Sequence, residues 1–91
     1  MKNTGIELIT QERNEQIEKH SWTKFHDKDR NTKNQLSIAA WKLISLDSED
    51  RIDNPPYDWN IHVWNKMASK PRKERLIIAA ALIAAEIDRI Q

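Results

Sequence analysis

The sequence predicts an all-α fold, a small helical domain of three main helices plus a possible short helix, completed by oligomerisation. Its 91 residues include one Gly and three Pro. Tight β-hairpins rely on Gly at their turns, so a chain of this composition is not expected to form many strands. Apolar residues recur at helical spacing over residues 4–20, 35–46 and 71–91, and a chain of this length fits one domain, residues 1–91.

The helix over residues 4–20 begins at a capping box. Thr4 and Glu7 stand three residues apart, so each side chain can bond to the backbone N–H of the other residue. One stripe of this helix is apolar at both ends and polar in the middle: Ile6, Ile9, Arg13, Gln16 and Ile17. Two interpretations fit this stripe. The polar residues lie near the edge of an ordinary amphipathic helix, or they face a shared cavity.

The helix over residues 35–46 follows a charged loop, residues 21–34, and takes Asn34 or Thr32 as its cap. Its expected buried stripe is Leu36, Ala39, Ala40, Leu43 and Ile44. Two adjacent alanines in this stripe would allow another helix to approach closely.

Residues 47–70 are the least regular part of the sequence. Pro55 and Pro56 block a helix there, whereas a short helix is possible from about Asn60. Long structureless loops are uncommon in compact domains. The segment is therefore a lid, a mobile insertion, or a loop packed by its own aromatic residues.

The helix over residues 71–91 starts at Pro71, a residue suited to a first helical turn. Two neighbouring faces of this helix are apolar: Leu76, Ala80, Ile83, Ile87 and Ile90 on one, and Ile77, Ala81 and Ala84 on the other. Because residues 76–85 are apolar nearly all round, the helix should be buried on most sides. A chain this small cannot supply that cover alone, so we expect a homo-oligomer.

The composition excludes several classes of protein. The net charge is +1, which gives no electrostatic footprint for binding a nucleic acid polymer. The chain has no Cys, so disulfides and thiolate metal sites are excluded, as suits a reducing cytoplasm. The longest apolar run, residues 76–85, is about half of a membrane span. We therefore expect a soluble cytoplasmic protein with no membrane partner.

Several carboxylates are candidates for metal binding. Glu12, Glu15 and Glu18 follow one another at a spacing of three residues, which places neighbours on one side of a helix. Mg²⁺ prefers carboxylate oxygens, often from a couple of side chains plus substrate phosphates. These acids either bind a metal or form a solvated face. Asp27 and Asp29 bind a metal, position a water, or pair with neighbouring Lys and Arg residues.

Three further features have both a structural and a functional interpretation. Glu86 stands in the apolar part of the last helix, where a carboxylate is either functional or paired with Arg89. The four Trp residues pack in the core, or one or two of them stack on a nucleobase. The basic run over residues 70–75 is a solvated first turn or a phosphate contact.

Four groups of residues, taken in order, resemble a known family: Glu12, Arg13, Gln16 and Ile17; Trp22, Thr23, His26 and Asp27; Gln35, Leu36, Ala39 and Ala40; and Ala81, Leu82, Ile83, Ala85, Glu86, Ile87 and Arg89. The chain resembles phage and prophage MazG-like nucleotide pyrophosphohydrolases, in the group named after dATP/dGTP diphosphohydrolase N-terminal regions. Asn34 stands where this group usually has Gly, and Arg89 interrupts the second acidic cluster of the wider family pattern.

The resemblance implies a helical oligomer in the cytoplasm of a bacterial host, which holds a nucleotide beside Mg²⁺ or Mn²⁺. The implied reaction is attack of water on a nucleoside triphosphate, which releases the monophosphate and pyrophosphate. The candidate residues that we derive are Glu12, Glu15 and Glu86 for the metal, Asp27 and Asp29 for catalysis, and Trp22, His26, Lys70, Arg72, Lys73 and Arg75 for the substrate.

Two other functions remain open at this point. The incomplete second acidic cluster and the abundance of Trp, Lys and Arg fit a protein that binds a nucleotide, or a nucleotide-derived signal of antiviral defence, without hydrolysing it. A structural helical oligomer, or an inhibitor of another protein, would bind no nucleotide at all.

Overall fold

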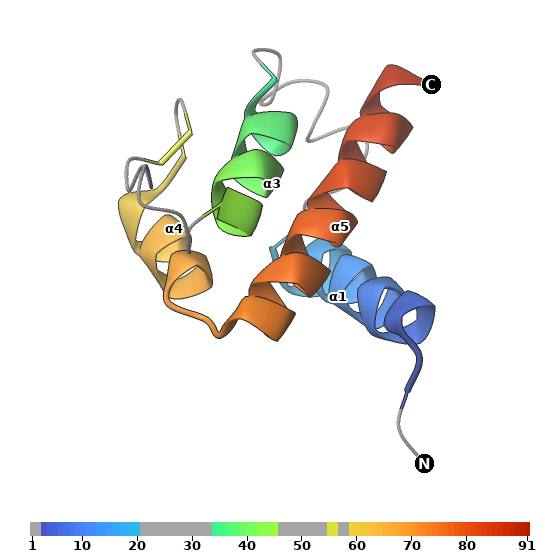
Figure 1. The fold of residues 1–91 in the computed structure, drawn as a ribbon. Coiled ribbons are helices and arrows are strands. Elements are labelled where there is room, and N and C mark those ends of the chain that lie inside the picture. Colours follow the sequence, from blue (N-terminus) through green and yellow to red (C-terminus); the bar gives the residue numbers. More distant parts are fainter. Residues whose placement is uncertain (1–2, 21–33, 46–54, 57–58) are drawn as a thin grey trace.

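The computed structural model describes residues 3–20, 34–45, 55–56 and 59–91, and this part of the chain is all-helical, with no strand, as predicted. The helices are α1 (Gly5–His20), α3 (Gln35–Ser45), α4 (Ile61–Ala68) and α5 (Arg72–Ile90). Helix α5 packs against each of the other three, with α3 beside it and α1 crossing behind its first half (Figure 1). None of these helices combines the length and the apolar character needed to cross a membrane.

The predicted capping box starts α1. The backbone N–H of Glu7 donates to Thr4 Oγ1 at 3.2 Å, and the N–H of Thr4 donates to Glu7 Oε1 at 3.0 Å. These bonds satisfy two backbone donors that have no partner within the helix. They also lower the pKa of the Glu7 carboxyl below its ordinary value, because the N–H and hydroxyl groups of Thr4 favour the ionised form.

The middle of α1 is more buried than its ends. Arg13 is 9% exposed and Gln16 is 1% exposed, whereas Ile6 is 75% exposed and Ile17 is 36% exposed. The interpretation that placed Arg13 and Gln16 near the helix edge is therefore wrong. Arg13 Nη2 lies 3.6 Å from Asp88 Oδ2, and this ion pair joins α1 to the last turns of α5.

The core lies mainly between α3 and α5. Ala39 and Ala40 are at most 2% exposed, which confirms the expected close approach of a second helix at this pair. Ile44 was predicted in the same stripe but is 41% exposed, because it lies toward the outer side of α3. The buried residues of α5 are Arg75, Ile78, Ala79, Ala81, Leu82 and Ala85.

Helix α4 confirms the short helix predicted from about Asn60. The Asn60 side chain caps it by accepting from the N–H groups of His62 and Val63 at 2.8 Å and 3.2 Å. Trp64 is fully buried, and its ring meets the Trp59 ring edge to face at a centroid distance of 6.4 Å. This described part of the 47–70 segment is therefore packed against the core by aromatic residues.

Arg75 is a charged residue inside this core. It is 5% exposed, its Nη1 donates to the Leu43 carbonyl at 2.9 Å, and its Nε donates to the Lys70 carbonyl at 2.9 Å. Leu43 belongs to the last turns of α3, where helix carbonyls lack an intrahelical donor. Arg75 therefore fastens the start of α5 to the end of α3 and to the α4–α5 connection.

We predict that Arg75→Met lowers the free energy of unfolding by about 2–3 kcal/mol, because it leaves the buried Leu43 carbonyl and the part-buried Lys70 carbonyl without their charged donor. Arg75→Lys should be destabilising too, since an ammonium group cannot reproduce the forked geometry. Chemical denaturation followed by circular dichroism measures both effects. Lys73→Met is the matched control at an exposed position of the same turn, and equal stability losses at positions 73 and 75 would contradict the assignment.

We predict that the Glu7 carboxyl titrates below the ordinary carboxyl range, and that Thr4→Ala raises its pKa toward the ordinary value. Because the pKa is lowered in the folded state, the cap stabilises α1 above the ordinary carboxyl pKa. This stabilisation is lost as the pH falls through the lowered value. An NMR titration of the Glu7 side chain measures the shift, and a Glu7 pKa that Thr4→Ala leaves unchanged would contradict this account.

Candidate functional site

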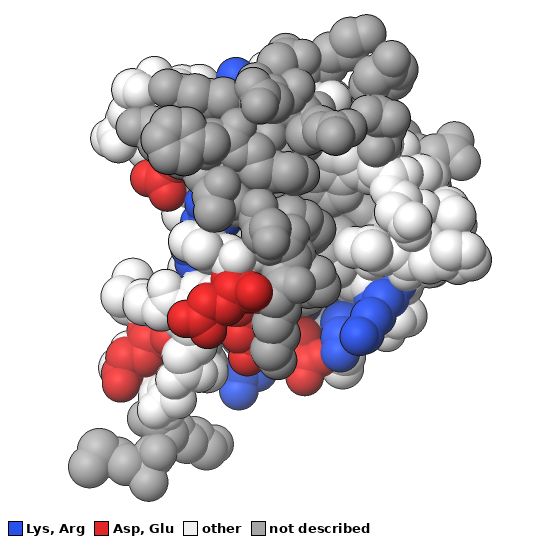
Figure 2. Space-filling model, turned by 180° about the vertical axis from the view of Figure 1, so that it is seen from behind, with Lys and Arg blue, Asp and Glu red and all other residues white. Residues whose placement is uncertain are grey.

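A cavity of about 260 Å³ lies between α1 and the start of α5, and we call it the acidic cavity. Its lining residues are Leu8, Gln11, Glu12, Glu15, Lys70, Glu74, Ile77 and Ile78. It brings together residues that the sequence singled out on two separate segments: Glu12 and Glu15 on α1, and Lys70 in the α4–α5 connection. Figure 2 shows acidic side chains gathered beside basic side chains on the face opposite to the view of Figure 1.

Helical periodicity explains how α1 supplies one wall of the acidic cavity. Leu8, Gln11, Glu12 and Glu15 follow the i, i+3, i+4, i+7 pattern, which places all four on one face. Glu12 is half-buried, and its Oε2 accepts a hydrogen bond from Gln16 Nε2 at 3.3 Å. Because Gln16 is itself buried, this bond orients the Glu12 carboxylate at the cavity wall. Glu15, one turn further along, is exposed.

The basic run divides between two cavities and the core. Lys70 lines the acidic cavity, whereas Arg72 and Lys73 line an adjoining cavity of about 700 Å³ that we call the apolar cavity. Its other lining residues are Asn3, Gly5, Leu8, Ile9, Leu76 and Ile77. Leu8 and Ile77 line both cavities. Arg75 instead lies in the core, so we assign it a structural role and not the substrate-binding role expected from the sequence.

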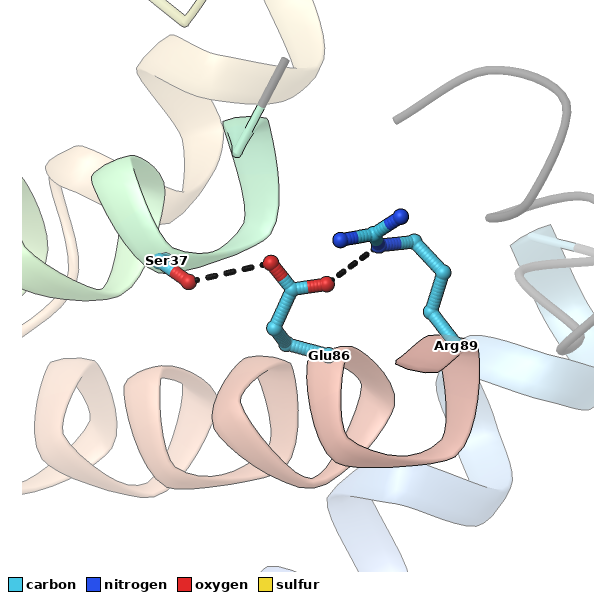
Figure 3. Close-up of polar contacts among 3 residues, drawn as sticks. All are labelled: Ser37, Glu86 and Arg89. Carbon is cyan, nitrogen blue, oxygen red and sulfur yellow. Dashed lines mark hydrogen bonds and ion pairs between the residues drawn. The ribbon is translucent and has the colours of Figure 1, made fainter. Parts of the chain in front are cut away.

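Glu86 lies away from the acidic cavity, between the second half of α5 and the start of α3. Ser37 Oγ donates to Glu86 Oε2 at 3.1 Å, and Arg89 Nε donates to Glu86 Oε1 (Figure 3). The Glu86 side chain is 13% exposed. These contacts agree with the predicted pairing to Arg89 and add a link to α3 that the sequence did not indicate.

Only two of the three candidate metal ligands, Glu12 and Glu15, line the same cavity. Within residues 3–20, 34–45, 55–56 and 59–91, no group of three or more His, Asp or Glu side chains could hold a metal ion. Glu12, Glu15 and Glu86 therefore do not form one metal centre by themselves. Glu12 and Glu15 together suit a Mg²⁺ ion that takes its remaining ligands from phosphate oxygens and water, since Mg²⁺ commonly uses only one or two carboxylates.

Two polar residues of the acidic cavity were missed in the sequence. Gln11 stands four residues before Glu15, and Glu74 stands four residues after Lys70. Helical spacing from Glu15 is the signal that could have found Gln11, whereas Lys70 precedes α5, so no helical spacing links it to Glu74. Four predicted site residues lie outside the described part of the chain: Trp22, His26, Asp27 and Asp29.

Comparison of the chain with protein-family models, with curated proteins and with solved structures finds no match. The resemblance to MazG-like pyrophosphohydrolases therefore stays a prediction, and the function must be argued from the two cavities and their lining residues.

Proposed function

We propose that the chain is a phage-type, Mg²⁺-dependent nucleoside triphosphate pyrophosphohydrolase that binds its substrate at the acidic cavity, in the cytoplasm of the bacterial host. One observation carries the proposal: Glu12, Glu15 and Lys70, selected from the sequence as metal and phosphate ligands, line the same cavity although Lys70 stands far from both acids along the chain. A metal–polyphosphate complex needs both kinds of group side by side.

Three lining residues, Glu12, Glu15 and Lys70, have a chemical role in this proposal. The bound Mg²⁺ or Mn²⁺ ion would neutralise phosphate charge and favour a nucleophilic water. The carboxylates of Glu12 and Glu15 would hold that ion, and the Gln16 amide keeps Glu12 in place. Lys70 would bind a phosphate oxygen from the other side of the cavity. Arg72 and Lys73, in the first turn of α5, add positive charge at the adjoining apolar cavity.

The rest of the candidate set rests on the sequence: Trp22, His26 and Asp27 belong to the resemblance, and Asp29 is a neighbouring acid. Asp27 and Asp29 would orient the attacking water, and Trp22 and His26 would contact the nucleotide. These four residues belong to residues 21–34. Helix α1 ends at His20, immediately before them, and α3 begins at Gln35, directly after them. The segment therefore starts at the helix that carries Glu12 and Glu15.

A second function, nucleotide binding without hydrolysis, is supported by the contacts of Glu86. Its two carboxylate oxygens already accept bonds from Ser37 and Arg89, so it is not poised as a third metal ligand. In this alternative the same cavity sequesters a nucleotide or a nucleotide-derived signal and releases no product.

The first experiment incubates the protein with a panel of NTPs and dNTPs, in Mg²⁺ or Mn²⁺, and separates the products by chromatography. We expect a nucleoside monophosphate and pyrophosphate, with a preference for some bases. Unchanged nucleotides that are retained by the protein would contradict the enzyme and favour sequestration. Unchanged nucleotides without retention would contradict both functions.

We predict that Glu12→Gln reduces kcat/KM by about 100-fold or more, because it removes a metal ligand without changing the size of the side chain. Glu18→Gln is the matched control, since Glu18 is an exposed acid of α1 outside the lining of the acidic cavity. Steady-state kinetics at several Mg²⁺ concentrations measure the effect. Equal losses in the two variants would place the metal elsewhere.

We predict that Glu86→Gln affects stability more than nucleotide affinity, because Glu86 joins α3 to α5 outside the acidic cavity. Breaking this charge-assisted contact should cost about 1–3 kcal/mol. Ser37→Ala removes one bond to the same carboxylate and is the comparison variant. Denaturation and Mg²⁺–nucleotide titration are run on both. Full stability combined with lost turnover in Glu86→Gln would instead make Glu86 a catalytic residue.

A further inference from the structure

One face of α5 is apolar, and its four large side chains are exposed. The residues of this face, which we call the α5 stripe, are Leu76, Ala80, Ile83, Ile87 and Ile90. Leu76 is 39% exposed, Ile83 44%, Ile87 49% and Ile90 65%. These fractions are high for large aliphatic side chains in a continuous row, and such rows mark interaction surfaces.

The spacing of the α5 stripe is that of a helix–helix seam. Successive members stand four, three, four and three residues apart, which is the heptad pattern of paired helices. The opposite side of α5 faces the core through Ile78, Leu82 and Ala85. The stripe is therefore a second packing surface that the described part of the chain leaves exposed.

The stripe continues into the apolar cavity at its first residue. Leu76 belongs to both, and Leu8, Ile9 and Ile77 supply the other aliphatic side chains that line the cavity. The surface thus combines a ridge along the second half of α5 with a hollow of about 700 Å³ beside its first half. A partner that fits this shape must place apolar side chains in the hollow. It must also offer an apolar surface to the ridge.

We propose that a second copy of this chain docks on this surface, with its α5 antiparallel to α5 of the first and the two-fold axis close to Ile83. Ile83 lies seven residues from both Leu76 and Ile90. Antiparallel pairing therefore sets Leu76 against the partner's Ile90, where the apolar cavity begins. It also brings the small Ala80 next to the partner's Ile87, which is one residue away from the position directly opposite. The same patch serves both copies, as a two-fold interface requires.

Charge complementarity selects the antiparallel arrangement. Arg72 and Lys73 lie at the start of α5 and line the apolar cavity. In an antiparallel pair they meet the last turn of the partner's α5, which carries the negative end of the helix dipole. A parallel pair would bring the two basic starts together, and like charges at close range are unfavourable.

The size of the surface sets the expected strength of the dimer. Eight residues line the apolar cavity, and the α5 stripe adds four beyond Leu76. A standard stable interface uses about 20–30 residues a side, so this one is smaller. We therefore expect a dimer that dissociates on dilution.

Analytical ultracentrifugation of the full chain from micromolar to millimolar concentration tests the association. We expect a reversible monomer–dimer equilibrium that Ile83→Lys weakens by at least about 100-fold, because it places two charges at the centre of an apolar seam. Ile61→Lys is the matched control, since Ile61 is 45% exposed and lies on α4. A monomer at all concentrations would overturn the proposal, as would equal effects of the two variants.

Cysteine cross-linking tests the orientation and does not depend on the folding of Ile83→Lys. The chain has no Cys, so any disulfide must form between the introduced residues. Under oxidation, Leu76→Cys mixed with Ile90→Cys should form a disulfide-linked dimer, whereas Leu76→Cys alone should not, because disulfides need Cβ atoms about 4 Å apart. Cross-linking of Leu76→Cys to itself, or none in the mixture, would overturn the antiparallel arrangement.

Discussion

The close packing of α5 against α3 is the constraint on which the rest of the structure depends. It is possible because both helices present alanines at the contact, and Ala39 and Ala85 are fully buried there. Arg75 then fixes the relative position of the helices by donating to the Leu43 carbonyl. The link from Ser37 to Glu86 holds the other end of the same pair. With α5 fixed in this way, α1 can pack across its other side, and the acidic and apolar cavities form where α1 and α5 meet.

Polar groups are used inside this small domain to position the helix that carries the candidate metal ligands. Arg13 pairs with Asp88 and so joins the middle of α1 to the end of α5. Gln16, one turn later, is buried and holds Glu12 through its amide. In the part of the chain that the structure describes, Gln16 Oε1 is buried without a hydrogen-bond partner, and such a group costs stability. The arrangement therefore gives up some stability and fixes the Glu12 carboxylate at the wall of the acidic cavity.

Periodicity and capping rules predicted the helices and their starts, because these depend on residues a few positions apart. The Thr4–Glu7 box and the start of α4 beside Asn60 are examples. Asn34 has a φ of 61°, a conformation that Gly and Asn adopt most readily, which accounts for Asn at a position where the resembled family has Gly.

The sequence could not show which apolar face of α5 would be buried by α3. It also could not single out Arg75 from a run of basic residues, since its burial depends on carbonyls distant along the chain. The meeting of Glu12 and Glu15 with Lys70 has the same tertiary origin.

The two cavities share Leu8 and Ile77, and this common wall links the proposed dimer to the proposed nucleotide site. A partner helix in the apolar cavity would press on one side of these residues and so restrict the approach of α1 to α5. The separation of α1 from α5 also sets the distance between the carboxylates on α1 and Lys70. Any ligand that prefers one spacing of the helices must then favour the association state that stabilises that spacing, because coupling between two binding equilibria is reciprocal. Mg²⁺–nucleotide and the second copy would accordingly change each other's affinity by the same factor. This coupling requires no contact between the nucleotide and the partner.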